Sequence, residues 1–103
     1  MREIWKDIQG YEQLYQISNL GNVKRLHTDK KQGTGNYERM EKILSQRLNN
    51  NGYFIVDLYK NNKRTQFLVH RLVAMAFLHN PNNFLCVNHK DENRQNNHSD
   101  NLE

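Results

Sequence analysis

The pattern of hydrophobic and polar positions predicts short strands in the first two thirds of the chain. Residues 14–17 (Leu-Tyr-Gln-Ile) and 23–26 (Val-Lys-Arg-Leu) are predicted as a pair of short strands, and Asn19-Leu20-Gly21-Asn22 between them has the composition of a tight turn. Residues 28–38 are polar and contain glycine, so we expect a linker or loop there. This segment is the predicted domain boundary.

The next apolar runs predict a β-meander. Residues 43–48 are compatible with helix or strand, but the Asn-Asn-Asn-Gly run that follows favours a hairpin and therefore a strand. Residues 53–59 have strong β-propensity, residues 60–64 form a basic turn, and residues 65–69 return as a third strand.

From Val69 the apolar spacing changes to that of a helix. Val69, Leu72, Val73, Ala76 and Phe77 form one stripe at helical spacing, and Asn80-Pro81 should end the helix. Residues 84–87 predict a buried strand, and residues 88–101 then contain no apolar side chain. The expected fold class is α+β: a small β module, a β-meander, a short helix, a strand and a polar loop.

Composition limits the function classes. The chain has 103 residues, 36% of them hydrophobic, which suits one compact core. Lys and Arg number 15 against 11 Asp and Glu, a net charge of +4 that suits a polyanionic partner. Cys86 is the only cysteine, so no internal disulfide forms. No apolar signal segment and no run of about 18 apolar residues occurs, which predicts a soluble cytoplasmic protein without a membrane span.

The polar segment 88–101 carries the candidate chemistry. It cannot order itself by burying apolar surface, so it is either a tail or a loop held by hydrogen bonds, a metal or a ligand. A neutral imidazole such as His89 accepts protons near pH 7, and the oxygens of Asn88 and Asp91 suit hard cations. At a strand end, Asn88 could bind a metal while His89 deprotonates a water molecule. Phosphodiester hydrolysis needs both functions. The alternative is a structural histidine bonded to a backbone carbonyl.

Other polar residues have simpler interpretations. Asn93, Asn96 and Asn97 suit turns, whereas Asn101, beside Leu102, is the candidate for an amide that braces the loop. Cys86 and His89 have the spacing of half a zinc site, but His79 and His98 do not form the second close pair, so the sequence disfavours zinc.

Basic residues in turns and at element ends could follow a phosphate backbone, or could simply be solvated surface. Arg71 also stands at the predicted helix start, where phosphate can bind. The candidates for DNA contact are Lys24, Arg25, Lys60, Lys63, Arg64 and Arg71.

Two long motifs resemble a known family. The first resembles the NUMOD-type module at the front of phage- and intron-encoded nucleases: Trp5-Lys6-Asp7-Ile8-x-Gly10-Tyr11-Glu12-x-x-Tyr15-x-Ile17-Ser18-Asn19-x-Gly21-x-Val23. The second resembles HNH homing-type endonucleases: Val69-His70-Arg71-Leu72-Val73-Ala74-x-Ala76-Phe77, then Val87-Asn88-His89-Lys90-Asp91-x-Asn93-x-x-Asn96-Asn97-x-x-x-Asn101-Leu102-Glu103.

The resemblance implies a ββα-metal core acting on double-stranded DNA in a phage or bacterial host cell, with one divalent cation. It implies that Asn88 is a metal ligand, His89 the general base and Asn101 the middle Asn that braces the loop. The family often has Asp at the position of Asn88, so the neutral amide implies weaker Mg²⁺ binding and tolerance of Mn²⁺. The family also often has Gly at the position of Glu92.

In the family, a helix beyond the Asn-Leu-Glu run supplies a further metal ligand, whereas this sequence ends at Glu103. We therefore expect residues 1–38 to form a DNA-contacting β module and residues 39–103 to form a C-terminally truncated HNH domain. We expect the protein to be a monomer. Three hypotheses remain open at this point: a metal-dependent DNA endonuclease, a non-cleaving DNA-binding module or remnant, and a zinc-stabilised interaction domain.

Overall fold

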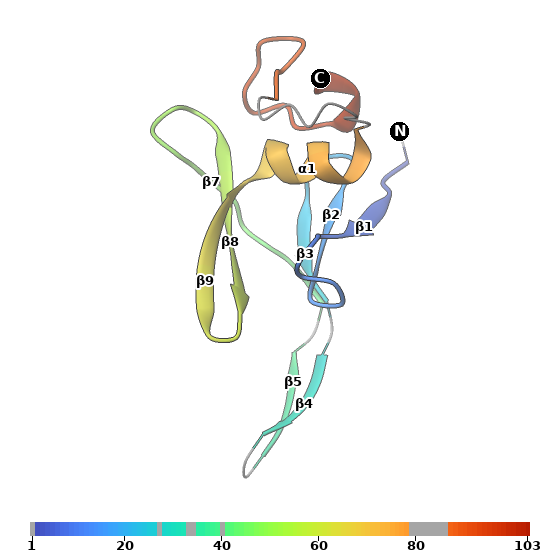
Figure 1. Cartoon of the computed structure of the whole chain (residues 1–103), viewed down its shortest axis with the longest axis vertical. Coiled ribbons are helices and arrows are strands. Elements are labelled where there is room, and N and C mark those ends of the chain that lie inside the picture. The colour runs from blue at the N-terminus through green and yellow to red at the C-terminus, as the bar shows by residue number, and fades with distance from the viewer. Residues whose placement is uncertain (1, 27, 33–34, 40, 79–86) are drawn as a thin grey trace.

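The computed structural model describes residues 2–26, 28–32, 35–39, 41–78 and 87–103 (Figure 1). The helices in these ranges are α1 (Val69–Phe77) and a short 3-10 helix, η1 (Ser99–Asn101). The strands are β1 (Trp5–Asp7), β2 (Tyr15–Ser18), β3 (Val23–Arg25), β4 (Thr28–Gln32), β5 (Gly35–Arg39), β6 (Lys42–Ile43), β7 (Arg47–Leu48), β8 (Phe54–Lys60) and β9 (Lys63–Leu68).

The first sheet is antiparallel and has the order β1-β2-β3-β6. The predicted hairpin is confirmed as β2 and β3, with Ile17 opposite Val23. Strand β6 pairs with β3, so this sheet continues past the predicted division after residue 38. The division between residues 1–38 and 39–103 stays a prediction.

The polar segment predicted as a linker or loop forms a hairpin instead. Strands β4 and β5 pair from Thr28↔Arg39 to Gln32↔Gly35, and the hairpin extends away from the rest of the chain (Figure 1). Backbone hydrogen bonds hold such a ribbon without any apolar alternation, which is why the hydrophobic pattern did not predict it.

The predicted meander is confirmed as the sheet β7-β8-β9. The strand expected over residues 43–48 is divided, however, because β6 pairs with β3 in the first sheet and only β7 pairs with β8. Its β8–β9 hairpin closes at Asn61 and Asn62, whose φ angles of 54° and 64° are those of a two-residue type I′ turn. At the other end, Asn49 Oδ1 accepts hydrogen bonds from the backbone N–H groups of Asn51 and Tyr53.

The predicted helical stripe is confirmed as α1, which packs against both larger sheets and against the C-terminal segment (Figure 1). Val69, Leu72 and Val73 are buried in one core with residues of both sheets and of the chain end: Ile17, Val23, Val56, Leu58 and Leu102. The α+β fold class is thus confirmed. Predictions for residues 79–86, including the helix stop, Cys86 and most of the strand 84–87, lie outside the described residues.

Among the described residues, no helix has the length and apolar content that crossing a membrane requires.

A side-chain hydrogen bond joins β2 of the first sheet to β8 of the meander: the backbone N–H of Tyr59 donates to Tyr15 Oη at 3.1 Å. Tyr15→Phe leaves that N–H without its acceptor, so we expect a loss of about 1–2 kcal/mol in the free energy of unfolding, measured with urea. Tyr59→Phe is the control, because the Tyr59 side chain is 53% exposed. Equal losses in the two variants would contradict a role for this bond.

Candidate functional site

The polar segment is an ordered loop rather than a tail. Asn88 N–H donates to Glu103 O at 2.9 Å, Glu103 N–H donates to Asn88 O at 3.0 Å, and Lys90 N–H donates to Asn101 O at 2.7 Å. His89 and Leu102 form an antiparallel bridge, and Leu102 is 2% exposed in the hydrophobic core. The two ends of the loop are therefore fixed to each other and to the body of the protein.

Asp91 holds the interior of the loop. Its carboxylate accepts hydrogen bonds from Asn93 N at 2.8 Å, Asn96 Nδ2 at 2.8 Å and Asn101 Nδ2 at 2.9 Å. These bonds, led by that from Asn96, lower the pKa of Asp91 below its usual value. Both carboxylate oxygens accept hydrogen bonds within the loop, so Asp91 holds the loop together, and its role as a cation ligand stays a prediction.

Asn101 makes the contacts that a loop-bracing residue needs. Its Nδ2 donates to Asp91 and to Asn96 O at 2.9 Å, and its Oδ1 accepts from Asp91 N–H at 3.2 Å. The family role implied for Asn101 stays a prediction. Glu92 has φ of 62°, the left-handed conformation that glycine adopts readily, at the position where the family often has glycine.

His89 is held by Asn97. The imidazole is 5% exposed, and its Nε2 lies 2.9 Å from Asn97 Oδ1. Because an amide oxygen only accepts, Nε2 carries the proton and Nδ1 carries the lone pair. Within the described residues Nδ1 has no hydrogen-bond partner. The ring bonds to a side chain, not to the backbone carbonyl that the structural alternative expected.

Asn97 was missed from the sequence, where it was assigned to turn chemistry. It is 4% exposed, which an asparagine in an ordinary surface turn would not be. The sequence offers no signal that separates Asn97 from its neighbours Asn93 and Asn96, because which amide turns inward depends on the loop's path.

Two further rings surround His89. The centroid of His70 lies 5.1 Å from that of His89, and the Tyr53 ring lies 4.9 Å from His70 and 5.9 Å from His89. Arg94, whose guanidinium stacks over Tyr53 at 5.1 Å, donates to Asn51 O and so connects the loop to the β7–β8 turn. This aromatic wall was not predicted as part of the site.

His70 is buried on α1, with its Nδ1 lacking a hydrogen-bond partner. Burial lowers the pKa of His70 to about 4, with smaller effects from His89 and Arg71. His70 is thus neutral at pH 7, and only Arg71 of the His70-Arg71 pair is exposed to a phosphate.

Asn88 is exposed, and its Nδ2 donates to Glu103 Oε1 at 3.0 Å. The described residues contain no group of three or more His, Cys, Asp or Glu side chains that could hold a metal ion. The oxygens beside Asn88 are its own amide oxygen and the Glu103 carboxylate, which are of the kind that hard cations prefer.

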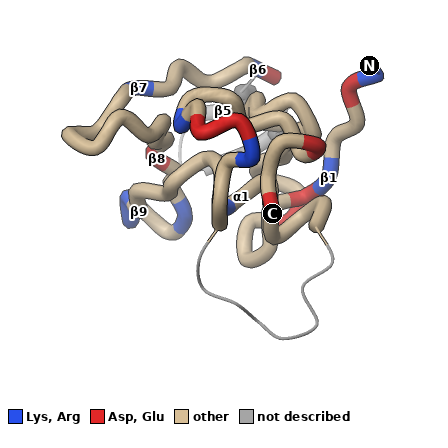
Figure 2. Tube along the Cα trace, turned by 90° about the horizontal axis from the view of Figure 1, so that it is seen from above, with Lys and Arg blue, Asp and Glu red and all other residues tan. Residues whose placement is uncertain are grey.

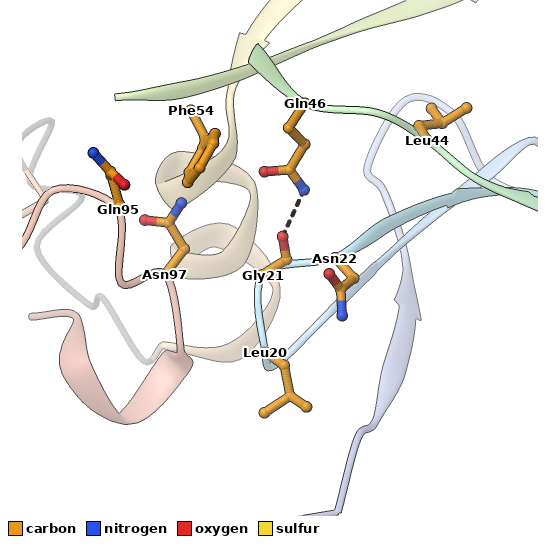
Figure 3. A pocket seen from close by; sticks show the side chains of 8 residues that line it. All are labelled: Leu20, Gly21, Asn22, Leu44, Gln46, Phe54, Gln95 and Asn97. Atoms are coloured by element: carbon orange, nitrogen blue, oxygen red, sulfur yellow. Dashed lines mark hydrogen bonds between the residues drawn. The ribbon is translucent and has the colours of Figure 1, made fainter. Parts of the chain in front are cut away.

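A pocket of about 330 Å³ lies beside Asn97, between the first sheet and the loop (Figure 3). Gln46 Nε2 donates to Gly21 O at 2.8 Å across this pocket. The lining side chains are apolar or neutral amides: Leu20, Gly21, Asn22, Leu44, Gln46, Phe54, Gln95 and Asn97.

The predicted DNA-contacting residues lie in separate places. Lys24 and Arg25 are on β3, and Lys24 is 3.6 Å from Glu41 and stacks over Trp5. The charged end of the β8–β9 hairpin is visible in Figure 2, and Lys63 and Arg64 are exposed there. Lys60, at the same hairpin end, donates to Gly10 O at 2.6 Å. Arg71 is exposed on α1.

Comparison with known proteins gives consistent matches. The family profile described as the NUMOD4 motif matches residues 3–59. DNA endonuclease I-HmuI of Bacillus phage SP01 is 42% identical over 98 residues, covering 95% of this chain and 49% of that protein. Uncharacterised HNH endonuclease L247 of Acanthamoeba polyphaga mimivirus is 42% identical over 106 residues, covering 98% of this chain and 23% of that protein.

A solved structure that describes DNA binding and cleavage by the HNH homing endonuclease I-HmuI matches with a TM-score of 0.78 and 40% identity. The match covers 96% of this chain and 50% of that one. The chain thus spans about half the length of I-HmuI and less than a quarter of the mimivirus protein.

The buried His70 should make stability depend on pH. Its pKa is about 4 when folded and about 6.5 when unfolded, so its contribution is present above pH 6.5 and is lost as the pH falls toward 4. We expect it to remove on the order of 3 kcal/mol between pH 7 and pH 4. In His70→Gln this part of the acid destabilisation should be absent, as measured by urea unfolding at both pH values. Parallel losses in the variant and the parent would contradict the assignment.

Proposed function

The chain belongs to the HNH homing-type endonucleases that carry a NUMOD4 motif, and we propose that it hydrolyses phosphodiester bonds in double-stranded DNA with His89 as the general base. The observation that carries this proposal is the bond between His89 Nε2 and Asn97 Oδ1. It leaves Nδ1 as the nitrogen with a free lone pair, which a base must have. The similarity to I-HmuI, a homing endonuclease that binds and cleaves DNA, supports the substrate class.

In the proposed mechanism, His89 Nδ1 takes a proton from the attacking water. Asn97 keeps the proton on Nε2 and fixes the ring orientation, as the partner of a catalytic imidazole does in other hydrolases. His70 is neutral, so it places no like charge beside the imidazolium that forms. Tyr53 and His70 close one side of the ring and limit its movement.

Asn88 would contribute its amide oxygen to one divalent cation, Mg²⁺ or Mn²⁺. Asn88 is exposed at the start of the polar loop, and the Glu103 carboxylate lies beside it. These oxygens fit a hard cation, with water and phosphate oxygens as further ligands. When bound, such a cation stabilises negative charge on the phosphate and on the leaving oxygen. Zinc does not fit this oxygen-rich set.

For DNA contact we propose Lys24 and Arg25 of the module formed by residues 1–38, together with the basic residues of the β8–β9 hairpin and α1. Lys63, Arg64 and Arg71 are exposed, so phosphates can approach them. The phage and viral origin of the relatives supports action in the cytoplasm of a phage-infected or bacterial host cell. Action as a monomer stays a prediction.

A second candidate function is DNA binding without cleavage. The observation that favours it is the lack of a three-residue metal-ligand group among the described residues. It predicts salt-dependent duplex binding and no strand cleavage with any cation.

Plasmid nicking tests the role of His89. With Mg²⁺ or Mn²⁺ present, His89→Ala should lower the nicking rate by about 100-fold or more, because the water loses its base. His98→Ala is the matched control, since His98 is exposed on the same loop. Nicking by His89→Ala at the parent rate would remove His89 from the mechanism, and no nicking by the parent chain with either cation would favour the binding-only alternative.

The hairpin prediction concerns binding alone. Replacing both Lys63 and Arg64 with Glu should weaken duplex binding and reduce the slope of log K against log salt by about 2, because two phosphate contacts are lost. Lys42→Glu is the control for general charge, since Lys42 is exposed on β6. Equal effects per charge in the two variants, measured by fluorescence anisotropy, would show that the hairpin makes no specific contact.

A further inference from the structure

The turn that joins β2 to β3 is rigid. Ser18 is fully buried, and its Oγ accepts hydrogen bonds from Leu20 N at 3.2 Å and Asn22 N at 3.1 Å. The backbone adds Ser18 N to Asn22 O at 2.8 Å and Gly21 N to Ser18 O at 3.1 Å. A turn with this many internal bonds does not adjust easily when a neighbour changes.

This turn contacts the polar loop, residues 88–101, at two points. Asn19 O accepts a hydrogen bond from Ser99 N at 2.7 Å. At Gly21, a Cβ atom would lie 2.9 Å from Asn97 Cβ and 3.2 Å from Asn97 O. The contact is therefore between the backbone of the turn and the fixed part of Asn97, not the movable end of a side chain.

Gly21 is also held from its other side. Gln46 Nε2 donates to Gly21 O at 2.8 Å, and the two residues face each other across the pocket that Asn97 lines (Figure 3). The chain of contacts runs from Gln46 through Gly21 and Asn97 to His89 Nε2.

We propose that Gly21 is a positioning residue for the general base: its missing side chain lets the N-terminal turn seat Asn97 where the Asn97 amide can hold His89. The proposal rests on the proposed role of His89 in DNA cleavage. It makes the first sheet part of the active-site framework as well as a DNA-contacting surface. A methyl group at residue 21 would have to displace Asn97 by several tenths of an ångström, and errors of about 1 Å in placement cost about 100-fold in rate.

Gly21→Ala is the test and Gly10→Ala is its matched control. Both glycines have a left-handed backbone, with φ of +89° and +86°, so both variants carry the same conformational strain. A Cβ at residue 10 would meet nothing within 4 Å, so only Gly21→Ala adds the contact with Asn97. In plasmid nicking, Gly21→Ala should lower kcat by about 10-fold or more with KM within about twofold, while Gly10→Ala should stay within about twofold of the parent.

A double-mutant cycle shows whether the effect passes through Asn97. Asn97→Ala already removes the amide that holds His89, so adding Gly21→Ala to it should lower kcat no further. Additive losses in kcat would overturn the proposal, because they would mean that Gly21 acts by another route.

A second readout needs no cleavage. The Nε2–H proton of His89 should exchange slowly in the parent and in Gly10→Ala, as seen in imidazole ¹⁵N–¹H spectra, and about 10-fold faster in Gly21→Ala. Gln46→Ala, which loosens the turn without adding an atom, should also speed this exchange. If Gly21→Ala fails to fold, Gln46→Ala decides the question by the same measurement.

The outcomes separate the two proposals. A parent chain that cleaves nothing but shows the exchange pattern refutes the proposed function and supports the seating of Asn97 by Gly21. A parent that cleaves, with Gly21→Ala equal to Gly10→Ala in both kcat and exchange, overturns the positioning role alone.

Discussion

The hydrogen bond between His89 Nε2 and Asn97 Oδ1 is the contact on which the candidate site depends. It fixes which ring nitrogen carries the proton, and hence which one can act as a base. Asn97 can make it only because the loop that carries it is closed at Asn88–Glu103, tied inside by Asp91, and anchored by Leu102 in the core. Hydrogen bonds to an ionised carboxylate here take the place of the apolar burial that the segment lacks.

The low exposure of His89, 5%, is compatible with catalysis because a base needs only one nitrogen open to its substrate. Burial has a different consequence for its neighbour. His70 has no hydrogen bond to Nδ1, and burial keeps it uncharged, so this ring adds no positive charge 5.1 Å from His89.

The sequence was sufficient where one face of an element is buried. The apolar residues at helical spacing from Val69 to Phe77 and the apolar residues of β2, β3 and β8 pack into a common core. It was insufficient for the β4–β5 hairpin, whose polar strands pair through the backbone, and for Asn97, whose inward direction depends on tertiary contacts with Gly21. The pairing of His70 with His89 was also missed, since a histidine at a helix start gives no sign of what it will face.

The sequence motifs divide the chain into a predicted DNA-contacting module and a predicted nuclease domain, but strand pairing and core packing join these two parts. β6, which follows the proposed division, completes the first sheet, and Ile17 and Val23 share one core with Val73 and Leu102. Asn19 and Gly21 then touch the loop directly. Packed interiors transmit displacement rather than absorb it, so under the proposed function a shift of the first sheet on binding DNA would reach Asn97 within two contacts. In that proposal, the packing that stabilises the fold also connects DNA contact with the orientation of His89.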